Sequence, residues 1–171
     1  MLDIDGYVPL KAPVSGIVHD LSRSDARAVY QNVLDSIPDR LSLLRSLCER
    51  NGYRNDPGGW TKLLADHVET EVDEDGRVSL HPVIKTVVLD ISLAMSQRLI
   101  DRSNGQLTWK FYTGSKRSLD FQRSVLVGFS KAAKSYQLHL FRPLTNMALT
   151  AANGEPMRDL SQYLEMLAED I

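Results

Sequence analysis

Acidic side chains recur over residues 66–75 just before a glycine, a pattern typical of metal sites. Glu71, Asp73, Asp75 and Gly76 match the first, third, fifth and sixth positions of a calcium-binding loop between two helices. The twelfth position of such a loop must supply both oxygens of a carboxylate, but Pro82 stands there and has no side-chain oxygen. We therefore predict a solvated acidic turn over residues 73–76 and no metal site.

The four histidines, His19, His67, His81 and His139, show no spacing typical of a zinc site. The chain has no HExxH sequence and only one cysteine, so the paired ligands that zinc requires are missing. His81 precedes Pro82, where a helix is expected to begin. We interpret the histidines as half-buried polar groups, and we expect neither a metal nor a cofactor.

Cys48 is the one thiol in the chain, and its neighbours argue against a role as a nucleophile. It continues an apolar stripe over residues 41–47, where a small buried thiol is the expected occupant. No GxSxG, Walker or GxGxxG sequence occurs, and Gly58 and Gly59 lack the lysine of a phosphate-binding loop. We therefore disfavour nucleotide hydrolysis and assign no catalytic residue.

Asp90 is the one acid inside the apolar stretch of a long predicted helix. Burial would raise the pKa of its carboxyl group and make Asp90 a candidate general base. Asp90 also lies at the margin between two apolar arcs of the helix, where water would solvate its carboxylate or an arginine such as Arg98 or Arg123 would pair with it. Structural ion pairs perturb acids as strongly as catalytic sites do, so a structural role is the simpler interpretation.

Basic residues are concentrated late in the chain. Residues 107–142 contain seven Lys or Arg and a single acid, Asp120. The whole chain has 20 basic and 22 acidic residues, so this segment carries about +6 and the remainder about −8. This segregation predicts one basic face on an otherwise acidic molecule.

The same basic segment alternates apolar and polar residues, which predicts β-strands with one buried face. The residues expected to face the core are Trp109, Phe111, Val125, Val127, Leu138 and Leu140. The outer face would then carry Lys110, Tyr112, Gln122 and His139, and the flanking turns would carry Lys116, Arg117, Lys131 and Lys134. These eight residues form our candidate binding site.

The leading functional hypothesis is a non-enzymatic protein-binding module that docks an acidic partner on this basic sheet face. A homodimer is included, because the acidic turn at residues 69–75 could meet the basic face of a second copy. One alternative is nucleic-acid binding through the same face, although stacking platforms use more aromatic residues than one. A second alternative is a hydrolase-like enzyme around Asp90, if folding brings His139 and Tyr112 beside it.

Bulk properties constrain the class of protein more than its function. The 171 residues are 43% hydrophobic, which suits a single domain over residues 1–171 with one substantial core. One cysteine and no apolar run of membrane-spanning length favour a soluble cytoplasmic protein that does not bind membranes. Its size and lack of catalytic motifs are shared with small bacterial accessory and toxin-neutralising proteins, which is an analogy only.

Helical periodicity dominates the first two thirds of the chain. Residues 1–21 contain two prolines and two glycines and are expected to form an extended lead-in, with an edge strand around Ile17. Pro38 should end a first helix near Ser36 and begin a second one. The predicted helices cover residues 24–36, 38–51, 60–68, 82–103, 143–154 and 159–169.

Strand periodicity appears around residues 78–80 and again in the basic segment, at 107–112, 121–129 and 136–140. The expected architecture is α+β: N-terminal helices and a long central helix packed on a small antiparallel sheet of about three strands, followed by a C-terminal helix.

Overall fold

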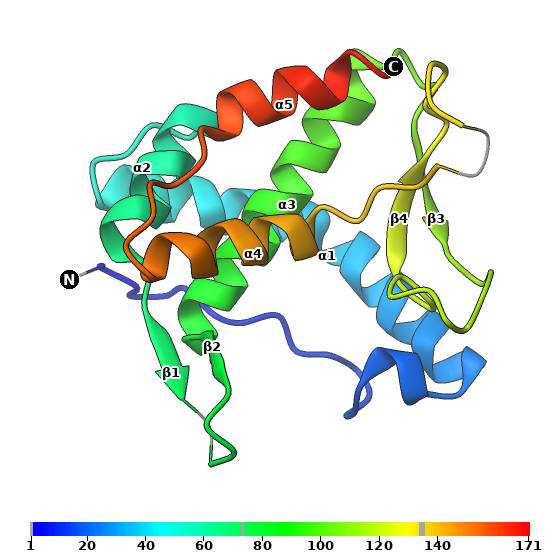
Figure 1. Ribbon diagram of the computed structural model, residues 1–171, viewed down its shortest axis with the longest axis horizontal. Coiled ribbons are helices and arrows are strands. Elements are labelled where there is room, and N and C mark those ends of the chain that lie inside the picture. The colour runs from blue at the N-terminus through cyan, green and yellow to red at the C-terminus, as the bar shows by residue number, and fades with distance from the viewer. Residues whose placement is uncertain (1, 73, 134–135) are drawn as a thin grey trace.

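The computed structural model describes residues 2–72, 74–133 and 136–171 of the chain. These residues form five α-helices, one short 3-10 helix and two antiparallel sheets of two strands each (Figure 1). The α+β class predicted from the sequence is therefore confirmed, with the strands arranged as two separate hairpins.

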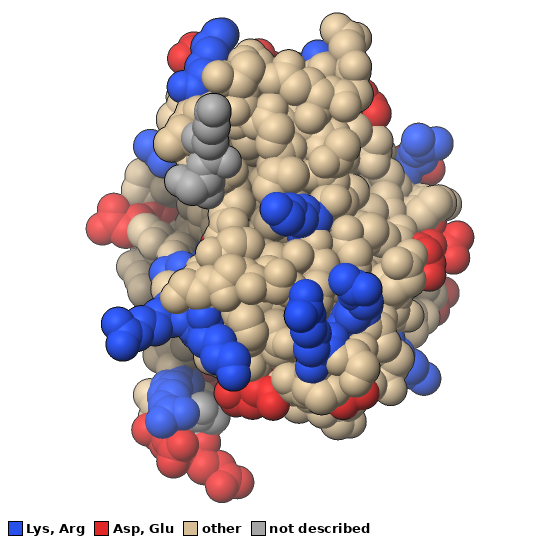
Figure 2. All heavy atoms as spheres, turned by 90° about the vertical axis from the view of Figure 1, so that its right-hand side faces the viewer, with Lys and Arg blue, Asp and Glu red and all other residues tan. Residues whose placement is uncertain are grey.

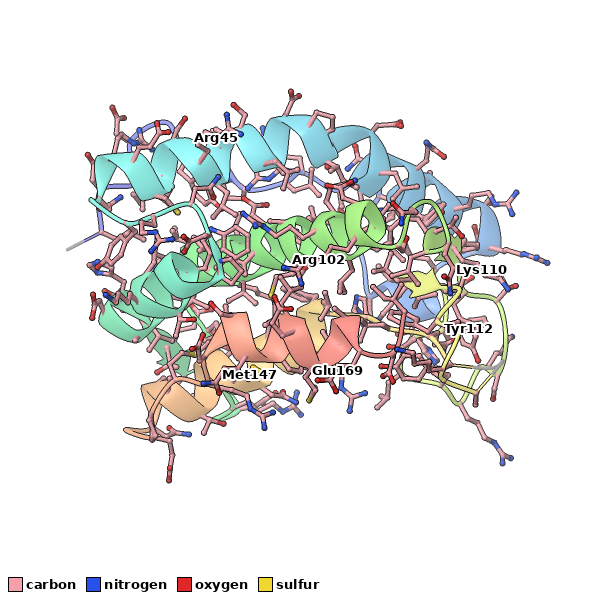
Figure 3. All side chains as sticks on the ribbon, turned by 90° about the horizontal axis from the view of Figure 1, so that it is seen from above. Arg45, Arg102, Lys110, Tyr112, Met147 and Glu169 are labelled. Carbon is pink, nitrogen blue, oxygen red and sulfur yellow. The ribbon has the colours of Figure 1, made fainter. Side chains whose placement is uncertain are left out.

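Helix α3 (Pro82–Arg102) occupies the centre of the molecule, as its two apolar arcs predict. Pro82 stands in its first turn, and Asn104 and Gly105 follow its end with φ angles of 50° and 85°. Seen from above, α3 lies between α1 on one side and α4 and α5 on the other (Figure 3). Its two flanks are thus covered mainly by helices, and the β3–β4 hairpin stands at one edge of the molecule (Figure 1).

Helix α1 (Arg23–Arg50) is continuous through Pro38, so the predicted break between residues 36 and 38 is wrong. Proline removes one backbone hydrogen bond and costs a helix interior about 3 kcal/mol. The helix nevertheless buries Ile37, Leu44 and Leu47 on one face that spans the proline, and this burial outweighs the lost bond. Figure 3 shows that α1 bends along its length, as a helix with an internal proline does.

The remaining helices agree with their predicted positions. They are α2 (Pro57–His67), α4 (Phe141–Ala152) and α5 (Leu160–Ala168). Asp56 caps α2 by accepting a hydrogen bond from the Gly59 backbone N–H, and Asp159 caps α5 in the same manner. Apolar side chains from all five α-helices join one buried cluster, which includes Leu44, Trp60, Ile91, Leu144 and Leu164.

The two hairpins are short and lie apart in the chain. Strand β1 (Thr70–Val72) pairs with β2 (Val78–Leu80), and this hairpin protrudes from the molecule (Figure 1). Strand β3 (Thr108–Phe111) pairs with β4 (Ser124–Val127), with Trp109 opposite Leu126. The predicted third strand at residues 136–140 is reduced to one bridge between Leu126 and Leu138, because the chain turns into α4 directly afterwards.

The lead-in carries no strand among its described residues, 2–21, so the predicted edge strand around Ile17 is wrong. Ile17 is 67% exposed and precedes a 3-10 turn, η1 (Val18–Asp20). Within the lead-in, Tyr7 is buried instead: it is 6% exposed and packs into the core. Without a neighbouring strand to pair with, the lead-in is held by side-chain contacts.

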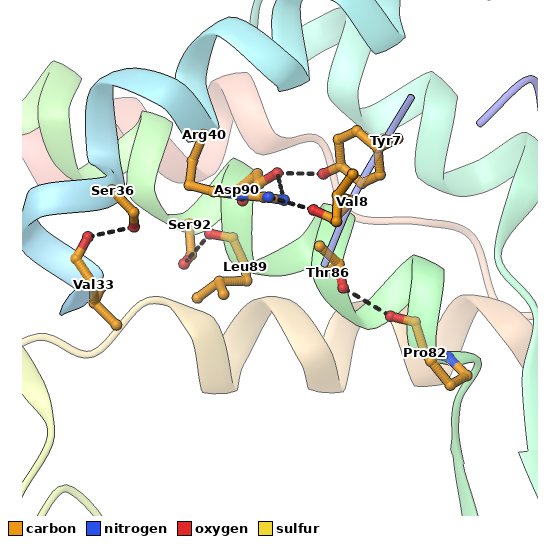
Figure 4. A network of polar contacts seen from close by, with 10 residues as sticks. All are labelled: Tyr7, Val8, Val33, Ser36, Arg40, Pro82, Thr86, Leu89, Asp90 and Ser92. Atoms are coloured by element: carbon orange, nitrogen blue, oxygen red, sulfur yellow. Dashed lines mark hydrogen bonds and ion pairs between the residues drawn. The ribbon is translucent and has the colours of Figure 1, made fainter. Parts of the chain in front are cut away.

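A buried polar triad of Tyr7, Arg40 and Asp90 joins the lead-in, α1 and α3 (Figure 4). Arg40 donates from Nε to Asp90 Oδ1 at 2.8 Å and from Nη2 to Oδ2 at 2.6 Å. The Tyr7 hydroxyl donates to the same Oδ2, and Arg40 Nη1 donates to the Val8 carbonyl. The side chain of Asp90 has no exposed surface and that of Arg40 is 5% exposed, so the pair is fully desolvated.

The environment of the triad is consistent with a structural role. Burial raises the pKa of the Asp90 carboxyl, although the hydrogen bonds from Arg40 and Tyr7 act to lower it. Burial and the adjacent Asp90 charge raise the pKa of the Tyr7 hydroxyl, so that it remains a proton donor. The partners predicted for Asp90 are wrong: Arg98 lies over the Trp60 ring, and Arg123 donates to the Leu119 carbonyl.

Removing one member of the pair should destabilise the fold strongly. Asp90→Ala or Arg40→Met is expected to lower the free energy of unfolding by about 3–5 kcal/mol, because each leaves a buried charge unpaired. The double variant Arg40→Met/Asp90→Leu should lose clearly less than the sum of the two single changes. Urea denaturation followed by circular dichroism measures all three values.

Asp101→Ala is the matched control, since Asp101 lies on the same helix and accepts a hydrogen bond from Gln97 at the exposed surface. It should change the free energy of unfolding by less than about 0.5 kcal/mol. Strictly additive losses at Arg40 and Asp90 would contradict a coupled pair.

Candidate functional site

Three basic side chains stand exposed on the outside of the β3–β4 hairpin and its connecting loop. Lys110 lies in β3 opposite Val125, and Lys116 and Arg117 lie in the loop that follows. Within the described part of the chain, none of the three forms an ion pair. We refer to these three residues as the basic surface. Figure 2 shows that basic side chains on this side of the molecule stand among uncharged residues, with acidic ones mainly at the margins.

Tyr112 follows β3 directly and is partly exposed, as predicted for an outward-facing residue. Its ring lies against Gly114, where a Cβ atom would come within 2.4 Å of the Tyr112 hydroxyl. Figure 3 shows Lys110 and Tyr112 together at the hairpin end of the molecule, away from Arg45 and Met147. The hairpin therefore presents one aromatic ring beside the basic surface.

Lys131 has a local partner. Its Nζ atom donates to the Glu169 carbonyl at 2.7 Å, and its backbone N–H donates to the Asp170 carbonyl. These carbonyls lie at the C-terminal end of α5, where a positive charge is stabilised by the helix dipole. Lys131 thus fastens the end of α5. Lys134, the other predicted turn lysine, lies outside the described residues.

Gln122 is buried, so its predicted place on the outer face is wrong. Its Nε2 atom donates to the carbonyls of Val18 at 2.9 Å and Leu21 at 3.1 Å, which ties the lead-in to the hairpin. The backbone of Gln122 has a φ of 61°. Side chains alternate between the two faces of a sheet only where the backbone is extended. The backbone of Gln122 is left-handed, so the alternation does not apply to its side chain.

His139 also points inward, with its side chain 15% exposed, because the chain bends toward α4 immediately after it. Its Nδ1 atom lies 3.6 Å from Asp120 Oδ1. Burial, followed by the positive charge of Arg123, lowers the pKa of His139 to about 4. The imidazole is therefore neutral at pH 7, and its contact with Asp120 is not an ion pair.

His139 and Gln122 both line a pocket between α1, α3 and the inner side of the β3–β4 hairpin. The pocket has a volume of about 180 Å³. Its walls are mostly apolar side chains, among them Val29, Val33, Leu89, Leu93, Trp109 and Leu140. Apolar pockets with a few polar groups are the usual form of small-molecule sites.

Two polar atoms in the wall of this pocket lack hydrogen-bond partners among the described residues. They are Nε1 of Trp109 and Nδ1 of His139, and both are buried. A buried polar group without a partner costs about 1–3 kcal/mol, so native structures contain few of them. Both atoms belong to residues that line the pocket, but the atoms themselves have almost no accessible surface.

A second cavity of about 220 Å³ adjoins this pocket and shares Arg123, His139 and Phe141 with it. Arg142 and Thr145 from α4 complete the adjoining lining. Sequence reasoning missed Arg123, Arg142 and Trp109 as site residues. The spacing of apolar residues marks Trp109 as buried, but no local pattern reveals that α1 leaves space beside it.

The catalytic alternative around Asp90 gains no support from the geometry. Asp90 is engaged by Arg40 and Tyr7 inside the core, whereas His139 lines the pocket and Tyr112 lies on the outer hairpin. Cys48 is buried, and burial raises the pKa of its thiol to about 11, which suppresses the thiolate.

The acidic hairpin offers no metal centre in the part of it that is described. Glu71 is exposed in β1, Asp75 lies 3.7 Å from Arg77, and Asp73 falls outside the described residues. No group of three or more His, Cys, Asp or Glu in the described ranges is arranged to hold a metal ion. None of the helices in those ranges combines the length and apolarity needed to cross a bilayer.

Comparison with known proteins found no family model, no curated protein and no solved structure that matches this chain. The class of this protein therefore rests on its fold and geometry. It is an α+β protein with a basic hairpin surface and a small pocket on the inner side of that hairpin.

The depressed pKa of His139 predicts a specific pH dependence of stability. The unfolded chain takes up a proton near pH 6.5, whereas folded His139 stays neutral down to about pH 4. The free energy of unfolding should therefore fall by up to about 3 kcal/mol as the pH drops through this window. His139→Gln should remove that contribution, measured by urea denaturation at pH 7 and pH 4.5.

Imidazole proton shifts in the folded protein provide the direct measurement. Titration of His139 near pH 6.5 in the folded state would show that the side chain is solvated, contrary to its placement here. The same resonance in urea serves as the reference for the unfolded chain.

Proposed function

We propose that this protein is a non-enzymatic protein-binding module that uses its basic surface to dock an acidic partner. The single observation that supports this most is that Lys110, Lys116 and Arg117 are exposed and have no ion-pair partner in the described part of the chain. Unpaired cations on one face steer an acidic partner toward it and orient it on contact.

A groove beside the basic surface offers space for part of a partner. It has a volume of about 750 Å³ and lies between residues 19–23, where the lead-in joins α1, and the loop after β3. Its lining includes Arg23, Lys116 and Phe121, with Asp20 as its one acid. His19 Nε2 contacts the Lys116 carbonyl at 2.7 Å, so the two sides of the groove are held together.

Nucleic-acid binding remains the second candidate for the same cations. Stacking surfaces for single strands use several exposed aromatic rings. Beside the basic surface, Tyr112 lies on Gly114 and Phe121 packs against the His19 ring at 5.4 Å between centroids. The few rings near these cations are thus already in contact with other groups, which favours a protein partner.

The proposed acidic partners include a second copy of this chain. The protruding β1–β2 hairpin carries Glu71 and Glu74 and exposes Val72 and Val78 at 65% and 54%. Such a hairpin could insert into the groove of a neighbouring molecule. A cytoplasmic location is part of the same proposal, and the single buried thiol is compatible with it.

Charge reversal on the basic surface tests the proposal. The tagged protein, the variant Lys116→Glu/Arg117→Glu and the control Arg45→Glu are each used to capture binders from nuclease-treated lysate, with quantification by mass spectrometry. Arg45 is exposed on α1, away from the hairpin (Figure 3). An acidic protein should be recovered with the wild type and the control and fall roughly tenfold or more with the reversal variant.

Two outcomes would contradict the proposal. One is equal recovery of the same proteins by the reversal variant. The other is recovery of nucleic acid alone from untreated lysate, with an affinity that falls steeply with salt concentration. Recovery of the untagged chain itself would identify the partner as a second copy.

A further inference from the structure

We infer that the pocket between α1, α3 and the inner side of the β3–β4 hairpin binds a small carboxylic acid with a single aromatic ring. This site is separate from the basic surface, so it stands or falls independently of the proposed docking function. The inference rests on the size of the pocket, its apolar walls and the cations at one side of it.

The volume of the pocket sets the size of the apolar part of the ligand. An engineered protein cavity of about 150 Å³ lined by apolar residues holds one benzene molecule. The present pocket measures about 180 Å³ and is lined by Val29, Val33, Leu89 and Leu93 from two helices. One six-membered ring with a short substituent therefore matches this volume.

Charge at one side of the pocket selects the head group. Arg123 lines the pocket and the adjoining cavity, and Arg142 lines that cavity as well. Arg123 donates from Nε to the Leu119 carbonyl at 3.1 Å, and neither arginine forms an ion pair with any described residue. Asp120 is the one acid close by, in contact with His139, so the nearby charges sum to about +1 and favour an anion.

Hydrogen bonding adds a second reason for an oxygen acceptor. Trp109 Nε1 can only donate, and it has no acceptor within the described structure. His139 Nδ1, the other unpaired atom, belongs to an imidazole that contributes no charge of its own at pH 7. Both atoms have almost no accessible surface, so a bound carboxylate would accept a hydrogen bond from Trp109 Nε1 only after a side-chain rotation. The rotation would give Trp109 Nε1 a charge-assisted hydrogen bond where it now has none.

Three further polar side chains of the lining, Ser92, Ser96 and Gln122, are already hydrogen-bonded within the protein. Ser92 Oγ donates to the Leu89 carbonyl at 2.6 Å, and Ser96 Oγ donates to the Ser92 carbonyl at 2.7 Å. Gln122 is engaged by the lead-in carbonyls. The α3 side of the pocket therefore behaves as an apolar wall.

Three probes with the same ring and different heads test the inference on the wild-type protein: phenylacetate, phenylacetamide and phenethylamine. Binding is measured by isothermal calorimetry and by the two tryptophan indole N–H resonances. Phenylacetate should bind and shift the Trp109 indole resonance, assigned by Trp109→Phe, but not that of buried Trp60. The amide should bind about tenfold more weakly, and the amine should show no binding.

Variants locate the two halves of the site. Arg123→Gln should weaken phenylacetate binding about tenfold and leave the amide unchanged, since it removes only the charge of the head-group partner. Arg45→Gln is the matched control, an exposed arginine on α1 away from the hairpin (Figure 3), and should have no effect. Val33→Phe should fill the pocket and abolish binding of all probes.

The inference is overturned if all three probes bind equally, or if phenylacetate fails to bind at millimolar concentration. It is also overturned if a folded Val33→Phe variant binds as the wild type does. The head-group series needs no substitution, so the test remains decisive if a variant does not fold.

Discussion

The ion pair between Arg40 and Asp90 joins α1 and α3, the two helices whose apolar side chains also line the pocket. Both side chains lie inside the core, where removing two charges from water is costly unless their geometry is close to ideal. Two hydrogen bonds between the pair and a third from Tyr7 provide this geometry. Leu89, the neighbour of Asp90 on α3, lines the pocket. The polar triad and the apolar pocket are thus adjacent parts of the same helix contact.

The β3–β4 hairpin has two different sides, and Gln122 connects them. Lys110 faces solvent from the outer side, whereas Trp109 lines the pocket on the inner side. Gln122 lines both the pocket and the groove beside Lys116, and its amide holds the lead-in at the boundary.

The features that depend only on neighbouring residues in the sequence were predictable. Helix α3 begins at Pro82 and ends before Asn104 and Gly105, and each of these residues acts through its own backbone preference. The cations of the basic surface were also predictable, because Lys110 lies in a strand of clear alternation and Lys116 follows a glycine turn. A further signal was present but not used: Arg40 shares the α1 face of Ile37 and Leu44, and a charge on an apolar face implies a buried partner.

Residues whose roles depend on distant segments were not predictable. Asp90 pairs with Arg40 fifty positions earlier in the chain, and none of its neighbours in sequence indicates which arginine reaches it. Pro38 should end a helix by local rules, yet packing across it maintains one.

By itself, the sequence determined the α+β class, most helices and the segregation of basic residues, because periodicity, capping and charge are properties of neighbouring residues. Only the tertiary structure decided that His139 and Gln122 turn inward and that a pocket forms beside Trp109. Empty space arises where helices from distant parts of the chain fail to fill the volume between them, and no local pattern of residues records that volume.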